Sequence, residues 1–251
     1  MKKMKTLITL ALVCLATISV NAQVKKPVVK KPVTTKAPVK KTTAVKKTTP
    51  VIKKEVKLPG TRIKITTDSG VMVIRLYDKT PQHRDNFIKL ANAHFFDSLL
   101  FHRVIQGFMI QGGDPQSKYA QPGEMLGSGD VGYTIPAEFD TSLIHKKGAL
   151  AAARTNNPAK ASSGCQFYIV QGNKYTDADL NNYEMNRGVK YSAAQRNIYK
   201  TIGGTPMLDM GYTVFGEVES GLNVIDKIAS VQKDGSDRPL GNVHMYIEVI
   251  K

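Results

Sequence analysis

One arginine, Arg103, stands among large apolar residues in the stretch LFHRVIQGFMIQGGDP at 100–115. Its guanidinium stays protonated and offers several rigid hydrogen-bond donors, and Gln111 adds an amide. Together with Phe108 and Met109, these side chains indicate an apolar pocket edged by one cation and one amide. Taken alone, the stretch also fits a hydrophobic hairpin with a surface arginine and a buried Phe/Met pair, because both residue types are common in protein cores.

Two short runs with the composition of β-strands must position these side chains. They meet at Gly107, where a residue without Cβ lets the backbone bend, and a Gly-Gly-Asp-Pro turn follows the second run. Because side chains alternate across a strand, Met109 and Gln111 share one face, and Phe108 lies on the other unless the bend re-aims it. The two runs cover residues 100–105 and 108–111.

Two further motifs follow in order along the chain. One is GCQFYI at 164–169, and the other is Leu208-Asp209 followed by YTVFG at 212–216. With the stretch 100–115, they resemble the motifs of the cyclophilin family of peptidyl-prolyl cis-trans isomerases, over about 62–251. The resemblance implies a mainly β fold: a closed eight-stranded antiparallel barrel capped by two α-helices. It also implies an isomerase that needs no cofactor.

The resemblance implies roles for individual residues. Arg103 would be the catalytic side chain, Gln111 would hold a substrate carbonyl, and Ala153 and Arg154 would face the residue before the proline. Phe108, Met109, Tyr168 and Leu208 would form the pocket for the proline ring. The complete substrate-binding set is Phe108, Met109, Gln111, Ala153, Arg154, Gln166, Tyr168, Leu208 and Tyr212.

Catalysis of prolyl isomerisation depends on how the substrate is positioned more than on reactive groups. An X–Pro bond prefers trans by only about 0.5–1 kcal/mol, but rotation breaks amide resonance across a barrier of about 18–20 kcal/mol. In the twisted transition state the prolyl nitrogen becomes a hydrogen-bond acceptor, so the guanidinium of Arg103 can bind this state better than the planar ground state. An apolar pocket that fixes the ring while the acyl side rotates supplies the rest.

Four positions depart from the residues that cyclophilins often carry. Tyr168 replaces Phe and Tyr212 replaces His, which leaves a ring with a polar tip at both places. Arg154 replaces Asn. Met207 replaces Trp, and a thioether cannot donate the hydrogen bond of an indole. The resemblance then implies weak binding of cyclosporin, a cyclic peptide that many cyclophilins hold partly through that donor.

Residues 1–22 have the form of a secretory signal peptide. A basic start is followed by an apolar run at 7–20 and by the small-residue cleavage site Val20-Asn21-Ala22. The apolar run is shorter than the roughly 20 residues of a comfortable membrane span. We therefore expect export, to the periplasm as first choice and to the medium as second.

Residues 23–60 have the composition of a disordered linker rich in Lys, Pro, Thr and Val. The segment 23–57 holds twelve lysines and one acid, and repelling charges and prolines keep such an arm extended. Removing the +3 of the leader and the +11 of the arm from the net charge of +16 leaves +2 for 58–251. The high charge is therefore no sign of specific nucleic-acid binding by the folded part. The arm is either a solubilising spacer or a contact to anionic envelope polymer or lipid.

Residues 61–251 are expected to form one domain, which starts with a hairpin of 61–67 and 71–77 and ends with a strand at 243–250. Two helices should cap its barrel. The first begins at Pro81 with Thr80 as its cap, and the second covers 221–230 with Ser220 as its cap. Helical spacing turns inward Phe87, Leu90, Ala91 and His94 in the first helix and Leu222, Ile225 and Ile228 in the second.

An insertion at 173–206 makes the chain longer here than the usual connection in the family. Two capping boxes, at 176–179 and 192–195, predict two short helices, and Gly203-Gly204 ends the second. Because the insertion lies between two of the pocket residues in sequence, it should flank the pocket. It either shapes the groove for longer chains or decorates its edge.

Two other patterns are weaker signals. GSGDVG at 127–132 fits the G-x-G-x-x-G pattern, but no apolar strand leads into it and Pro136 disfavours a following helix, so we expect a mobile glycine loop. Cys165 is the only cysteine left after signal removal, and its place in a predicted buried strand favours an inert thiol. The five histidines show no metal-ligand spacing.

Taken together, the motifs favour an exported isomerase that assists folding by acting on X–Pro bonds of unfolded or exported polypeptides. The competing hypothesis is a non-catalytic chaperone or binding module of the envelope that uses the groove and the basic arm. Intact Arg103, Gln111 and Leu208 favour the enzyme. The expected partners are proline-containing polypeptides, and the expected state is a monomer.

Overall fold

The computed structural model describes residues 60–250. The predicted leader at 1–22 and all but the last residue of the predicted arm at 23–60 lie outside the described residues. Within 60–250, no helix has both the length and the apolar character that crossing a membrane would require.

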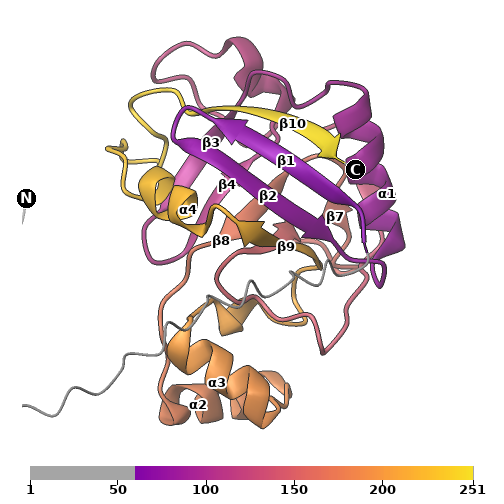
Figure 1. Ribbon diagram of the computed structural model, residues 1–251, viewed down its shortest axis with the longest axis vertical. Coiled ribbons are helices and arrows are strands. Elements are labelled where there is room, and N and C mark those ends of the chain that lie inside the picture. Colours follow the sequence, from indigo (N-terminus) through magenta and orange to yellow (C-terminus); the bar gives the residue numbers. More distant parts are fainter. Residues whose placement is uncertain (1–59, 251) are drawn as a thin grey trace, which may run out of the picture. The chain divides into compact units, whose positions relative to one another are not determined.

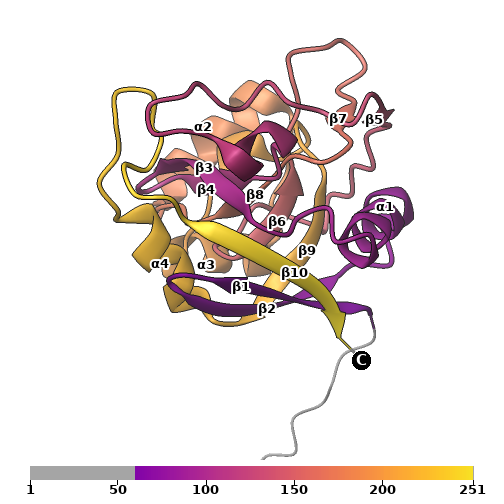
Figure 2. The same ribbon diagram turned by 90° about the horizontal axis from the view of Figure 1, so that it is seen from above.

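Eight antiparallel strands close into a barrel in the order β1-β10-β3-β4-β8-β6-β9-β2. Figures 1 and 2 show the barrel from two directions. The predicted barrel is therefore confirmed. A small separate sheet pairs β5 (Thr134–Ile135) with β7 (Ser162–Ser163). The barrel strands are β1 (Arg62–Thr67), β2 (Gly70–Leu76), β3 (Leu99–Ile105), β4 (Met109–Gly112), β6 (Ala149–Ala152), β8 (Phe167–Val170), β9 (Val214–Ser220) and β10 (His244–Ile250).

Helices cover the two ends of the barrel. Figures 1 and 2 place α1 (Pro81–Asn92) and α4 (Leu222–Ala229) on opposite sides of it. The Phe87 ring of α1 packs against Phe96, Phe167 and Phe215, with ring centroids 4.8–5.5 Å apart. Strand alternation fills the interior from the other side: Ile63 and Ile65 of β1 are fully buried, and Lys64 between them is not.

The predicted cap of the first helix has the right position but makes no capping bond, and the predicted cap of the last helix, Ser220, was wrong. Thr80 occupies the N-cap position of α1 without a capping hydrogen bond from its side chain. Instead Glu138, far away in sequence, accepts from the backbone N–H groups of the second and third helical residues at 3.1 and 3.0 Å. At α4 the N-cap residue is Gly221, with φ +88, because a Cβ there would lie 2.2 Å from the Val71 carbonyl oxygen.

Smaller corrections concern the inward faces and the first turn. His94 lies past the end of α1 and is exposed, and Leu222 is 38 % exposed at the start of α4. The other side chains predicted to point inward from these helices are buried. The first hairpin is tighter than expected, because Gly70 pairs with Thr67 and only two residues form the turn. The Thr67 hydroxyl donates to the Gly70 carbonyl at 2.9 Å, which closes that turn.

The insertion forms α2 (Asp177–Arg187) and α3 (Ala193–Thr201), which lie together outside the barrel (Figure 1). Both predicted capping boxes are present, and each satisfies backbone N–H groups that an α-helix leaves free at its start. The two ends of the insertion meet, since Asn173 and Gly204 exchange two backbone hydrogen bonds of 3.0 and 2.9 Å. A small apolar cluster of its own holds the insertion together: Ile144, Leu180, Tyr191 and Tyr199.

Candidate active site

A hollow of about 300 Å³ lies where β3, β4 and β8 meet the loops around residues 153 and 208–212. We call it the central hollow. Of the ten residues predicted for the site, nine line it, and the tenth, Gln166, lines the neighbouring hollow described below. The lining of the central hollow is Arg103, Phe108, Met109, Gln111, Ala153, Arg154, Tyr168, Leu208 and Tyr212.

The bend between β3 and β4 brings Phe108 into this set. Gly107 has φ +76, a left-handed conformation that favours glycine, and a Cβ there would lie 2.9 Å from the Asn173 side chain. The turn re-aims Phe108, which lines the central hollow beside Met109, whereas Ile110 is fully buried in the barrel core. The sequence allowed for a bend at Gly107 that re-aims Phe108, and the structure shows this bend.

Arg103 stands at the edge of the central hollow, directly across the β3–β4 ladder from Gln111. Its Nη1 donates to Gln111 Oε1 at 3.5 Å, and its Nε lies 3.9 Å from a carboxylate oxygen of Asp237. The side chain remains 42 % exposed. The guanidinium is thus held by weak contacts on one side, and its other donors are available to a group inside the hollow.

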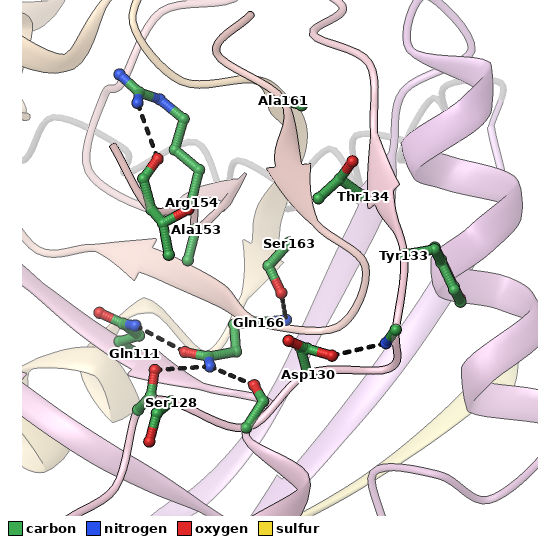
Figure 3. Close-up of a pocket in the computed structure, with 14 residues that line it drawn as sticks. Gln111, Ser128, Asp130, Tyr133, Thr134, Ala153, Arg154, Ala161, Ser163 and Gln166 are labelled. Carbon is green, nitrogen blue, oxygen red and sulfur yellow. Dashed lines mark hydrogen bonds between the residues drawn. The ribbon is translucent and has the colours of Figure 1, made fainter. Parts of the chain in front are cut away.

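A chain of amides fixes the orientation of Gln111. Gln166 Nε2 donates to the carbonyl oxygens of Gly127 and Gly129 at 2.9 and 2.7 Å, as Figure 3 shows. Its Oε1 is therefore the atom that accepts from Gln111 Nε2, at 3.1 Å. Gln111 must then present its own oxygen to Arg103. Gln166, predicted to bind substrate, acts in this structure by orienting Gln111.

The loop at 127–132 supplies the two carbonyls that begin this chain. Asp114, completely buried, accepts from the backbone N–H groups of Gly127 and Gly129 and so holds the loop from beneath. The two-residue strand β5, not a helix, follows the loop, which gives it a different context from the dinucleotide fingerprint. The loop also lines a second hollow of about 660 Å³ (Figure 3), which shares Gln111, Ala153 and Arg154 with the central hollow and which we call the glycine-loop hollow.

A buried polar network stands behind the Tyr168 wall of the central hollow. The Tyr168 hydroxyl is hydrogen-bonded to His145 Nε2 at 3.0 Å, and His145 Nδ1 to Asp209 Oδ1 at 2.7 Å. Asp209 Oδ2 accepts from the hydroxyls of Tyr191 and Tyr199, both in the insertion. Burial, reinforced by Tyr212 and Asp209, holds the pKa of Tyr168 well above its usual value, so the hydroxyl keeps its proton. Sequence reasoning assigned no role to His145 or Asp209, because partners 64 residues apart leave no local pattern.

Arg154 is the second arginine in the lining of the central hollow. Its guanidinium lies 4.6 Å from the Tyr212 ring centroid, and its Nε donates to the Gly211 carbonyl at 2.9 Å. The backbone of Ala153 is occupied by the fold, since its N–H donates to Gln166 and its C=O accepts from Ser163. Of the two residues, Arg154 therefore offers the backbone edge that a bound peptide could use.

Two buried titratable groups lie close to the site. Burial, together with the charge of Arg103, lowers the pKa of His102 from 6.5 to about 4, although the charge of Asp114 opposes the shift. Burial raises the pKa of Cys165 to about 11, which fits the predicted inert thiol. Cys165 was predicted to lie in a strand, but it precedes β8 and belongs to no strand. Among residues 60–250, no group of His, Cys, Asp and Glu side chains is arranged to hold a metal ion.

Comparisons with known proteins agree with the fold. Residues 62–249 match the profile of the family described as cyclophilin type peptidyl-prolyl cis-trans isomerase/CLD. The chain belongs to this family, whose members are peptidyl-prolyl cis-trans isomerases.

Relatives and solved structures give the same result. A Staphylococcus haemolyticus protein named as a peptidyl-prolyl cis-trans isomerase is 31 % identical over 195 residues, 77 % of this chain and 93 % of that protein. A Streptococcus pyogenes protein named as a bifunctional phosphatase/peptidyl-prolyl cis-trans isomerase is 35 % identical, and the match spans 80 % of this chain but only 42 % of that relative. A Cryptosporidium parvum cyclophilin type isomerase shares the fold, with a TM-score of 0.58 and 21 % identity over 76 % of this chain and 98 % of its own.

Proposed function

We propose that Arg103 and the central hollow catalyse cis-trans isomerisation of X–Pro bonds in exported polypeptides. The observation that carries the proposal is the guanidinium of Arg103, oriented through Gln111 and Gln166, at the edge of a hollow whose lining is partly apolar. The second guanidinium in the lining, that of Arg154, is held by the Gly211 carbonyl and the Tyr212 ring. Phe108, Met109 and Tyr168 supply a surface against which a proline ring can pack. No part of this mechanism requires a group that the chain itself does not supply.

The energies of such a mechanism are modest. Shortening the isomerisation time from tens of seconds to tens of milliseconds takes about 4 kcal/mol, at about 1.36 kcal/mol per tenfold. A charge-assisted hydrogen bond from Arg103 to the prolyl nitrogen contributes about 1.5–3 kcal/mol of it. The remainder comes from holding the ring in the central hollow while the acyl side rotates.

Replacing Arg103 tests this mechanism. Arg103→Ala should lower turnover of a short proline peptide at least about tenfold and leave peptide affinity largely in place, because the lost bond belongs mainly to the transition state. Arg103→Lys should recover only part of the loss, since a point charge lacks the planar fork. The matched control is Arg84→Ala, which removes a surface arginine bound to Asp78 and Asp85 and should leave turnover unchanged. Near-normal turnover in folded Arg103→Ala would refute the mechanism.

Export and the basic arm complete the proposal. The signal-like start at 1–22 supports a periplasmic location, and the twelve lysines of 23–57 support contact with anionic envelope surfaces. The chain without its leader should bind isolated envelope material in low salt and be released by about 0.5 M salt, where surface charges are screened. Deleting 23–57 should abolish that binding without changing turnover of short peptides. Equal retention of the truncated protein would make the arm a spacer.

A further inference from the structure

A third hollow, of about 410 Å³, adjoins the central hollow on the side of the insertion. It shares Arg154, Leu208 and Tyr212 with the central hollow, so the two are continuous. Its remaining lining includes Lys160 from the loop before β7 and Arg187 from the last turn of α2. We call it the cationic hollow, because Arg154, Lys160 and Arg187 bring three positive charges to one place.

None of these three cations is paired with a carboxylate in the described part of the chain. Lys160 Nζ donates to the Met210 carbonyl at 3.2 Å and lies 5.4 Å from the Phe139 ring centroid. Arg154 donates to backbone carbonyls and stacks on Tyr212. The side chain of Arg187 is exposed and has no hydrogen bond or ion pair within residues 60–250. Neutral partners thus hold Arg154 and Lys160, Arg187 extends freely, and no carboxylate of the described domain compensates the three charges.

The one acid in the lining does not neutralise them locally. Asp209 is 4 % exposed, and both of its carboxylate oxygens already accept hydrogen bonds, from His145 on one side and from the two insertion tyrosines on the other. A buried carboxylate with its oxygens occupied cannot also bind the guanidinium groups at the surface. The cationic hollow therefore presents net positive charge to whatever enters it.

Most other arginines of the described domain lie close to a carboxylate. Arg62, Arg75, Arg84 and Arg196 each lie within ion-pair distance of at least one. Arg238, which is buried, instead donates to the backbone carbonyls of Gln121 and Glu124. The glycine-loop hollow, the other neighbour of the central hollow, is lined by Arg154 but also by the carboxylate of Asp130. Of the two hollows that flank the central one, the cationic hollow is therefore the one suited to an anion.

We infer that the cationic hollow is a specificity subsite that binds an acidic side chain of the substrate, Asp or Glu, close to the isomerised proline. The inference rests on the proposed function, because the proline must occupy the central hollow. An extended peptide advances about 3.3 Å per residue, so a side chain within about two residues of the proline can reach the adjoining hollow. The insertion, through Arg187, thereby takes part in substrate choice.

The test uses two sets of three proline peptides. One set carries Glu, Gln or Lys two residues before the proline, and the other carries Glu, Gln or Lys two residues after it. In low salt, one of the two Glu peptides should show kcat/KM about three- to tenfold above its Gln counterpart, since each solvent-exposed ion pair contributes at most about fivefold. The gain should be mainly in KM, because the charge contact is the same in ground and transition states. Lys at that position should lower kcat/KM below the Gln value.

Charge reversal assigns the effect to the hollow. Lys160→Glu and Arg187→Glu change exposed side chains outside the central hollow, and together they should abolish the preference for Glu or shift it to Lys. Turnover of the Gln peptide should stay within about twofold in these variants, which shows that they are folded. The matched control is Lys174→Glu, an equal charge change at an exposed lysine of the same insertion that lines none of the hollows. It should keep the preference.

The outcomes separate this inference from the function on which it rests. Turnover of all peptides with no Glu preference at either position, or a preference that survives the double reversal, would overturn the acidic subsite alone. Loss of the preference in Lys174→Glu as well would reduce it to an effect of overall charge. No turnover of any peptide would instead overturn the proposed function.

Discussion

Tyr168→Phe is the sharpest probe of the network behind the central hollow. The substitution restores the residue that cyclophilins often carry at this position and keeps the ring that lines the hollow. It removes only the hydroxyl, which lies 3.0 Å from His145 Nε2 at a place where Tyr168 is 4 % and the His145 side chain 1 % exposed. A change toward the common family residue should therefore destabilise this protein.

The expected size of the effect follows from burial. Water cannot replace the lost partner at such a depth, so the unpaired ring nitrogen should cost about 1–3 kcal/mol of unfolding free energy. In a domain of this size that corresponds to a Tm lowered by about 2–10 °C. Urea unfolding of the wild-type and variant chains should show a lower midpoint with an unchanged slope, since the surface exposed on unfolding is the same. Turnover of a short proline peptide should change by less than about threefold, because the ring remains in place.

A double-mutant cycle separates the hydrogen bond from simple packing loss. His145→Leu removes the other partner, so adding Tyr168→Phe to it should cost much less than Tyr168→Phe alone, with a coupling of about 1 kcal/mol or more. A Tyr168→Phe variant as stable as the wild type would refute the reasoning. Full additivity of the two changes would do the same, because it would show that the two side chains do not share a bond that matters.

Two further predictions concern residues beside the site. The fold lowers the pKa of His102 from 6.5 to about 4, so between these pH values the unfolded chain takes up a proton and the folded chain does not. This contribution to stability is therefore present above pH 6.5 and is lost as the pH falls toward 4. Unfolding at pH 7 and pH 4.5 should show a loss of up to about 3 kcal/mol that is smaller in His102→Leu, and an equal loss in both chains would contradict this. Met207 lines the cationic hollow and has no hydrogen-bond donor. Met207→Trp should therefore tighten cyclosporin inhibition about ten- to a hundredfold while altering peptide turnover much less. Tight inhibition of the unmodified chain would show that the role given to Met207 is wrong.

Local patterns predicted some elements of this fold well and others poorly, and the difference has a physical cause. The capping boxes of α2 and α3 depend on residues three apart, so both were found from sequence. The caps of α1 and α4 depend on Glu138 and on the approach of the β2 backbone to Gly221, which only the folded chain brings together. Such long-range contacts replace the side-chain bond expected from Thr80 at α1 and move the N-cap of α4 from Ser220 to Gly221.

The same distinction applies to the site. Most residues that line the central hollow lie in motifs that can be recognised along the chain, and the bend at Gly107 was visible as a glycine between two strand-like runs. The residues that hold them were not predictable in this way. The bond between His145 and Asp209 and the bonds from Gln166 to the carbonyls of the glycine loop join residues 37 to 64 apart in the sequence, and no spacing rule predicts them.

The backbone pairing of Asn173 with Gly204 also affects how the sequences of related chains can diverge. Closing a loop of about 30 residues costs about 3 kcal/mol of chain entropy, and each doubling of length adds only about 0.6 kcal/mol. Because two backbone hydrogen bonds already hold the ends of the insertion together, chain entropy sets no tight limit on the length of the segment at this point. A segment exchanged here must still donate hydrogen bonds to Asp209 Oδ2, as Tyr191 and Tyr199 do, because that carboxylate holds His145 in place. Within that condition, exchange of the segment beside the cationic hollow offers a route to new substrate preferences that leaves Arg103 untouched.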